Sequence, residues 1–264
     1  MPSALAASCL YLVVAFLQAK RSMRRSEASP SPIYALAVAA LLLHGYAAFA
    51  GLRSPDGINL GLFKAGSLIF WLINLSLLLS LTRRPLQNLM VILFPVSAMI
   101  TLIATVAPGN ASPLADVSGG LLLHIASSVL AYAVLTIAAC QAAAVAAQDY
   151  QLRHHHTRGV VKLLPPLQLM ESMLFELLWV GLVLLTVAIG SGFIFVEDFF
   201  AQHLVHKTVL TLCAWLLFAT LLWGHHRLGW RAQTAVRFTL GGFTALMLGY
   251  AGSKFVLELI LQRT

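Results

Sequence analysis

The sequence has few charged residues, and their scarcity argues against a water-soluble domain. Only 10% of its 264 residues are Asp, Glu, Lys or Arg, whereas 59% are hydrophobic. Soluble domains average about 25% charged and about 45 to 50% apolar residues. No polar stretch between the apolar segments is long enough to fold separately. We therefore predict a single membrane domain over residues 1–264.

The motifs of soluble enzymes are also missing. The three cysteines form no C-x-x-C or C-x-x-C-H sequence, so a dithiol oxidoreductase and a c-type cytochrome are both excluded. There is no G-x-S-x-G, P-loop or H-E-x-x-H motif to support hydrolysis or phosphoryl transfer. The net charge of +8 lies in short clusters between apolar runs, which argues against nucleic acid as a partner. We expect a protein that does not turn over a substrate.

What the sequence does contain is a succession of apolar segments, each near the length of about 20 residues that crosses a bilayer as a helix. We predict an all-α, polytopic bundle of about eight transmembrane helices in a lipid bilayer. The expected spans are 4–19, 33–50, 65–81, 87–106, 119–147, 169–192, 206–224 and 237–260. The fifth is expected to continue out of the bilayer toward Asp149 as a solvated extension.

The positions of lysine and arginine give this bundle a direction. Most of the 17 basic residues lie in one set of loops, which marks those loops as cytoplasmic. The other set holds few of them: Arg53, Lys64, Lys207, Lys254 and Arg263. We therefore expect the N-terminus and the C-terminus on the outer, periplasmic side.

Four of the nine histidines then fall on that outer side. His44 lies near the outer end of the second span and His124 near the start of the fifth, while His203 and His206 lie at the start of the seventh. Imidazoles from separate helices can be axial ligands to haem iron between apolar walls. Flat contact surface is available from Phe49, Trp71, Phe193, Phe195, Phe199 and Phe200, and Glu197 or Asp198 could orient an imidazole.

A simpler interpretation stays open for each of these residues. His44 and His124 would then hydrogen-bond to neighbouring helices, as polar residues in membrane bundles commonly do, and His203 and His206 would face water. The remaining histidines, His154–His156, His225 and His226, lie in predicted cytoplasmic loops. The triple histidine could bind a metal ion, but its polar surroundings favour a solvated loop. Glu171 and Glu176 lie early in the sixth span, where acidic residues favour the helix dipole.

Several short motifs occur in an order that is typical of one family. They are Leu43-His44-Gly45, Asn59-Leu60-Gly61-Leu62-Phe63, Leu122-Leu123-His124-Ile125, Glu171-Ser172-Met173-Leu174-Phe175-Glu176, Leu185-Thr186, Gly190-Ser191-Gly192, His206-Lys207-Thr208, Trp215, Gly224-His225-His226-Arg227 and Gly229-Trp230-Arg231. Over residues 33–260 the chain resembles the YpjD-type inner-membrane proteins of the cytochrome c assembly superfamily, relatives of the CcsA and HemX-like proteins.

This resemblance implies a protein that binds and handles a non-covalent, b-type haem, with cytochrome c maturation proteins as partners. It implies that His124 ligates the iron, because the family's ligand opens the helix after the large outer loop. His44 matches a histidine of the YpjD-like branch, whereas His206 stands where CcsA relatives have an acidic residue. The loop Phe193 to Phe200 has no tryptophan, unlike the haem-presenting loop of CcsA-type synthetases, so haem attachment is not implied.

Two other functional classes remain as alternatives to haem handling. A permease or an accessory subunit of an ion transporter would have interrupted helices and paired charges near the midplane, where this sequence has little beyond Asn74. A structural membrane scaffold would tolerate loss of each outer histidine.

Overall fold

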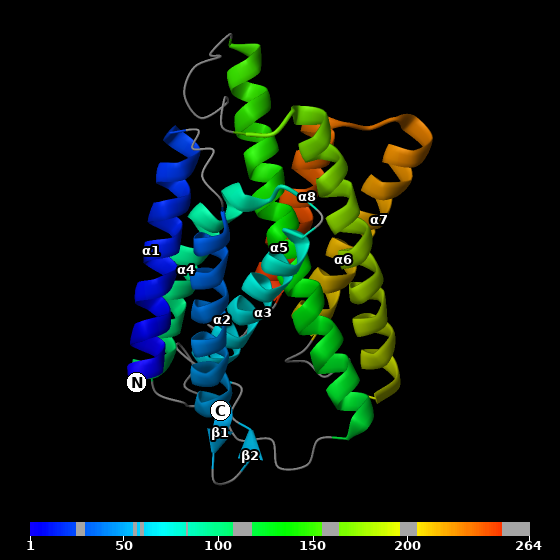
Figure 1. Ribbon diagram of the computed structural model, residues 1–264. Helices are drawn as coiled ribbons and strands as arrows, with labels where there is room; N and C mark the ends of the chain where they lie inside the picture. The colour runs from blue at the N-terminus through cyan, green and yellow to red at the C-terminus, as the bar shows by residue number, and fades with distance from the viewer. Residues whose placement is uncertain are drawn as a thin grey trace. The chain divides into compact units, whose positions relative to one another are not determined.

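The structure is a computed structural model that describes most of the chain. The described residues are 1–24, 30–54, 57–58, 61–82, 84–107, 118–154, 164–195 and 205–249. Their helices are α1 (Pro2–Arg24), α2 (Ser31–Leu52), α3 (Leu62–Ser80), α4 (Gln87–Val106), α5 (Gly119–Arg153), α6 (Leu167–Phe195), α7 (Val205–Leu228) and α8 (Ala232–Met247). Each helix overlaps one predicted span, so the predicted all-α membrane bundle is confirmed (Figure 1).

Seven of these helices, α1 to α7, are long and apolar enough to cross a bilayer. A helix suits this environment because all of its backbone hydrogen bonds are made within the segment. Within the described residues α8 has 16 residues, and positions 250–260 of the predicted eighth span lie outside them. The direction in which the helices cross stays a prediction.

The helices fall into two compact units, one with α1 to α4 and the other with α5 to α8. Within each unit, every helix packs against its neighbours in sequence and the first helix packs against the fourth. Each unit is thus a closed ring of four helices with its own buried centre. The prediction of one domain over residues 1–264 stays a prediction.

The core of the first unit is built around large side chains on α1, α3 and α4. Tyr11, Ile73, Leu77, Met90 and Phe94 are completely buried. The rings of Tyr11 and Phe94 meet edge to face, with centroids 4.8 Å apart. After α2, a short antiparallel pair joins β1 (Arg53–Ser54) to β2 (Gly57–Ile58), which fits the turn-forming residues between them.

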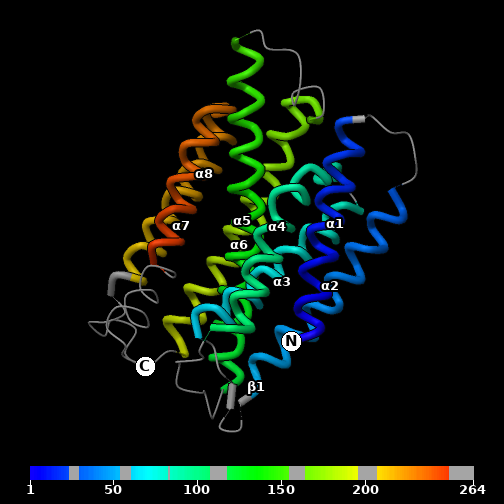
Figure 2. Tube along the Cα trace, turned by 90° about the vertical axis from the view of Figure 1, so that its left-hand side faces the viewer, coloured from blue at the N-terminus to red at the C-terminus, as the bar shows by residue number. Residues whose placement is uncertain are grey.

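The second unit is organised around its long first helix. α5 has 35 residues, and its C-terminal end extends beyond α6 in both views of the molecule (Figures 1 and 2). It begins at the N-cap Ser118, whose hydroxyl accepts a hydrogen bond from the amide of Leu121. Its Leu135 packs directly on Gly181 of α6, where a β-carbon would lie only 2.5 Å from the leucine side chain. Small residues therefore let α5 and α6 approach closely.

Candidate functional site

His44 lies in the centre of the first unit and is completely buried. α2 carries it, and side chains from the other three helices surround it. The hydroxyl of Tyr11 on α1 lies 3.1 Å from Nδ1. The hydroxyls of Ser67 on α3 and Thr101 on α4 lie 3.1 and 3.0 Å from Nε2. Both ring nitrogens of His44 are thus engaged by protein groups.

The neighbouring hydrogen bonds decide which nitrogen of His44 carries the proton. The hydroxyl of Thr101 donates to the backbone carbonyl of Ser97, at 2.7 Å, so its oxygen is left to accept from the ring. We therefore assign the proton to Nε2 and the lone pair to Nδ1, which accepts from Tyr11. In this arrangement the imidazole presents no lone pair to a metal ion.

The polar network continues from His44 through Thr101 to Ser97 and Asn74. The Asn74 amide donates to the Ser97 hydroxyl at 2.9 Å. Asn74 and Ser97 are completely buried. Unsatisfied polar groups in hydrocarbon are costly, and sliding one helix along another would break these hydrogen bonds. The network therefore favours one relative position of the four helices.

The aromatic residues expected beside His44 pack inside the same unit. The indole of Trp71 covers Gly45, where a β-carbon would lie 2.7 Å from its Nε1. That Nε1 donates to the carbonyl of Leu41 at 3.0 Å, and the ring meets Phe49 edge to face. Trp71 therefore fastens α3 to α2, using both its ring face and its donor.

His124 lies in the second unit, in a different setting. It is carried by the second turn of α5 and is half-buried. Its Nδ1 lies 2.8 Å from the backbone carbonyl of Ala188 on α6. A carbonyl can only accept, so Nδ1 carries the proton and, in the neutral ring, Nε2 keeps its lone pair. Among the described residues, no hydrogen bond uses this second nitrogen.

An aromatic side chain of α6 packs on α5 about one helical turn before His124. Gly120 precedes it by four residues, and Phe195 of α6 packs directly on that glycine, at 2.3 Å from the position of a β-carbon. Phe195 is 48% exposed, so its ring covers Gly120 while remaining accessible.

The geometry at His124 fits an axial ligand to a haem iron. Metal-bound histidines usually donate their other N–H to a carbonyl or carboxylate, which fixes the ring and directs the free nitrogen to the metal. The hydrogen bond to Ala188 provides this support, and Phe195 supplies an apolar surface. In the described part of the chain, including the surroundings of His124, no three His, Cys, Asp or Glu side chains gather into a metal site.

The alternative interpretation was that these histidines only hydrogen-bond to neighbouring helices or face water. His44 and His124 both hydrogen-bond to neighbouring helices, but only His44 does so through both nitrogens. α7 begins at Val205, so His206 lies on a helix, and its side chain is outside the described part. The remaining outer-loop candidates lie outside the described residues as well: Glu197, Asp198, Phe199, Phe200 and His203.

At the opposite end of α7, the structure corrects one expectation from the sequence. His225 and His226 are helical, in the last turns of α7, rather than in a loop. Nδ1 of His225 donates to the carbonyl of Trp230 at 2.7 Å, and its ring stacks on Phe175 with centroids 3.5 Å apart. Trp230 folds back over Gly224, where a β-carbon would lie 2.3 Å from its ring. The Gly224 to Trp230 motif thus builds a packed turn between α7 and α8.

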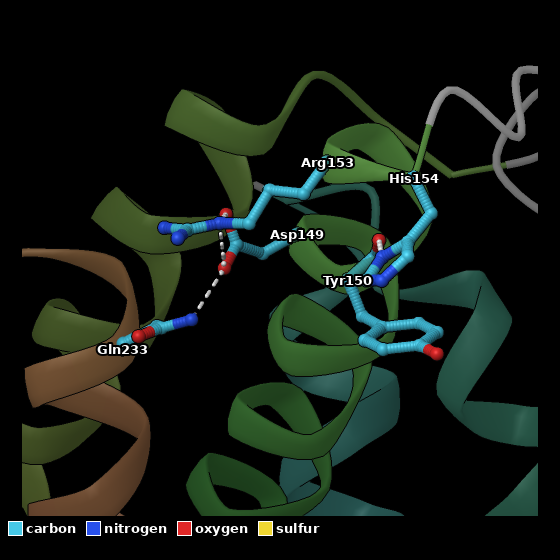
Figure 3. A network of polar contacts seen from close by, with 5 residues as sticks. All are labelled: Asp149, Tyr150, Arg153, His154 and Gln233. Atoms are coloured by element: carbon cyan, nitrogen blue, oxygen red, sulfur yellow. Dashed lines mark hydrogen bonds and ion pairs between the residues drawn. The ribbon is translucent and has the colours of Figure 1, made fainter.

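Asp149 links α5 to the start of α8 at this end. Its carboxylate accepts hydrogen bonds from Arg153 of α5, at 3.1 Å, and from Gln233 of α8, at 3.5 Å (Figure 3). On the same helix end, the ring of His154 lies beside that of Tyr150.

The helices and their buried polar side chains define a multi-pass, all-helical membrane protein. The family described as "Cytochrome C assembly protein" matches residues 33–261, so the chain belongs to the cytochrome c assembly family. It is 34% identical over 227 residues to "Inner membrane protein YpjD" of Escherichia coli, strain K12, covering 85% of this chain and 86% of that protein. The predicted resemblance and inner-membrane location are thereby confirmed.

A second relative extends the comparison. The "Uncharacterized 28.8 kDa protein in nifR3-like 5'region" of Azospirillum brasilense is 30% identical over 190 residues, 69% of each chain. No solved structure was found to match this chain.

Proposed function

We propose that this protein binds a non-covalent, b-type haem through His124 and handles that haem for cytochrome c assembly. The observation that carries the proposal is the hydrogen bond from His124 Nδ1 to the Ala188 carbonyl. It orients the neutral ring and leaves the lone pair of Nε2 available to coordinate iron. Membership of the cytochrome c assembly family supports the biological setting. Haem-maturation proteins in the same membrane are the expected partners.

The residues around His124 would each contribute to holding the group. A bound haem would supply an iron centre that accepts an axial imidazole nitrogen. The Ala188 carbonyl keeps the imidazole in the tautomer whose Nε2 lone pair can coordinate iron. Phe195 offers an apolar contact over Gly120. None of these contributions requires a covalent bond to the macrocycle.

His44 stays a predicted second ligand, but both of its ring nitrogens are hydrogen-bonded to protein hydroxyls. Its Nδ1 accepts from Tyr11 in our assignment, and its Nε2 donates to hydroxyls of Ser67 and Thr101. Coordination through Nδ1 would require the Tyr11 hydroxyl to leave the ring, and coordination through Nε2 would require the other tautomer. His203 and His206 stay predicted cofactor contacts on the sequence alone.

The test is an absorption spectrum of the full-length protein, expressed with ample haem and purified in detergent. We expect a Soret band in the wild type, its loss in His124→Ala, and its return when imidazole is added to His124→Ala. The return would separate a lost ligand from a misfolded protein. His154→Ala is the matched control, because His154 is exposed and bonds only within its own helix end.

Two results would overturn this proposal. One is a wild-type protein that takes up no haem under these conditions. The other is a Soret band of equal size in His124→Ala. Solute flux in proteoliposomes that survives the histidine substitutions would then favour the transport alternative, and normal cytochrome content in every histidine variant would favour a scaffold.

A further inference from the structure

One side of α7 is exposed along its whole length, and a cation stands at its end. Exposed residues recur there at intervals of three and four positions, which places them on one side of the helix. In chain order they are Val209, Cys213, Leu216, Thr220, Trp223 and Arg227. Trp223 is 59% exposed, and Arg227 lies one turn beyond it. The exposed side of α7 therefore passes from mainly apolar residues to an indole and then to a guanidinium group.

α8 has an exposed side of the same kind. Its residues are Gln233, Arg237, Leu240, Gly241, Thr244 and Leu248. α7 and α8 pack against each other and are joined by the turn at Gly229 (Figure 1). Trp223 lies five positions before the end of α7 at Leu228, and Arg237 lies five positions after the start of α8 at Ala232. Each is thus about 7.5 Å along its helix from the turn. The predicted spans have their limits at this same level, at 224 and 237.

The charges of Arg227 and Arg237 are not compensated within the described part of the chain. Neither side chain forms a hydrogen bond or an ion pair with another described residue. The acid that reaches the exposed side of α8 is Asp149, and it is already engaged by Arg153 and Gln233. An unpaired cation at the edge of the hydrocarbon layer is costly. Both arginines therefore favour an anion supplied from outside these residues.

The surface beside Arg237 also has room for the apolar part of a lipid. Gly241 follows Arg237 by one turn, and a β-carbon built there would meet nothing within 4 Å. An acyl chain can therefore lie along α8 at this point. Long arginine side chains extend toward the lipid headgroups while their stems stay on apolar surface, and an indole such as that of Trp223 favours the same interface. Arg231, in the turn itself, is exposed and adds to the positive field.

We propose that Arg227 and Arg237 bind the headgroup phosphate of an anionic phospholipid, whose acyl chain lies along α8 over Gly241. Guanidinium groups suit this ligand because their fixed N–H donors match the oxygens of a phosphate. The site lies at the end of the second unit where Asp149 contacts α8, whereas His124 lies near the other end of α5. The inference is therefore independent of the proposed haem function.

The experiment uses the full-length protein, purified and stripped of lipid in a neutral detergent. The probes are dioleoyl phosphatidylglycerol, dioleoyl phosphatidylcholine and inorganic phosphate. Native mass spectrometry titrates each bound lipid, and thermal unfolding measures the stabilisation that binding produces. We expect Arg227→Gln and Arg237→Gln each to weaken binding of phosphatidylglycerol about fivefold, which corresponds to about 1 kcal/mol, and the double variant to weaken it about 25-fold. Binding of phosphatidylcholine should not change.

The matched control is Arg153→Gln, which removes an exposed cation that is paired with Asp149. It should bind phosphatidylglycerol as the wild type does. Without lipid, the double variant should unfold at the wild-type temperature, because neither arginine has a partner to lose. Equal affinity of the wild type and the double variant for phosphatidylglycerol would overturn the inference, and so would equal weakening by Arg153→Gln. Stabilisation by inorganic phosphate as large as that by phosphatidylglycerol would also overturn it, since the site would then bind a free anion rather than a lipid.

Discussion

The hydroxyl of Tyr11 and Nδ1 of His44, 3.1 Å apart, join the first two helices at a point with no exposure to solvent or lipid. We predict that Tyr11→Phe lowers the stability of the protein by about 1 kcal/mol, because the ring nitrogen is left buried without its donor. Phenylalanine keeps the edge contact with Phe94, so the loss isolates the hydroxyl. Thermal unfolding in detergent, followed by circular dichroism, measures the change.

Tyr46→Phe is the control for this substitution, because Tyr46 lies on the same helix as His44 and is 71% exposed. It should leave the unfolding midpoint unchanged. Equal midpoints for the two phenylalanine variants would show that the buried network contributes nothing measurable.

Gly120 provides a test of the packing next to His124. A β-carbon at this position would lie 2.3 Å from the ring of Phe195, so Gly120→Ala must displace the ring and should cost about 1 to 3 kcal/mol. Its neighbour Gly119 has nothing within 4 Å, and Gly119→Ala should be neutral or slightly stabilising. Adding Phe195→Ala to Gly120→Ala should recover part of the loss in a thermal shift assay. A Gly120→Ala protein as stable as Gly119→Ala would contradict this packing.

Gly229 tests the turn that links α7 to α8. Its φ of +68° is left-handed, so Gly229→Ala should destabilise the protein by about 1 to 2 kcal/mol. Gly241→Ala should act in the opposite direction, since that glycine lies within α8 with open space around it and alanine is the better helix former. The midpoints of thermal unfolding compare the two variants. A stabilising Gly229→Ala would be incompatible with this turn.

The orientation of the chain can be tested with reporters. We expect alkaline phosphatase fused after Thr264 to be active, because it folds only outside the cytoplasm, and a fusion after Arg158 to be inactive. Green fluorescent protein at the same two positions should give the reverse pattern. An inactive C-terminal phosphatase with a fluorescent counterpart would place the C-terminus inside and refute the charge-based orientation.

Sequence patterns predicted the helices well, because apolar length is their main determinant in a membrane. The fourth span was predicted at 87–106, and α4 runs from Gln87 to Val106. The fifth apolar span was predicted at 119–147, with a solvated extension toward Asp149, and α5 does continue as a helix to Arg153. Hydropathy locates the part of a helix that lies in lipid, whereas the exact end of the extension depends on contacts such as the ion pair of Asp149 and Arg153.

The chemistry around each histidine was less accessible to sequence. Their predicted depth in the membrane made His44 and His124 equivalent candidates for haem ligands. The structure gives His44 three hydroxyl partners and His124 a single backbone carbonyl. Those partners are 23 to 64 positions away in the chain, as the separations of Ser67 and Ala188 illustrate. No local pattern encodes such contacts. For the same reason, the packing of His225 on Phe175 was not predicted.

The length of α5 has a mechanical consequence. Its 35 residues give about 52 Å of uninterrupted helix, longer than the roughly 30 Å hydrocarbon layer. His124 stands near one end of this rod, and Asp149, which receives Gln233 of α8, stands near the other. When a stiff helix tilts about its middle, its two ends move in opposite directions. A tilt of α5 that displaces His124 therefore also displaces Asp149, and it changes the hydrogen bond from Gln233 of α8.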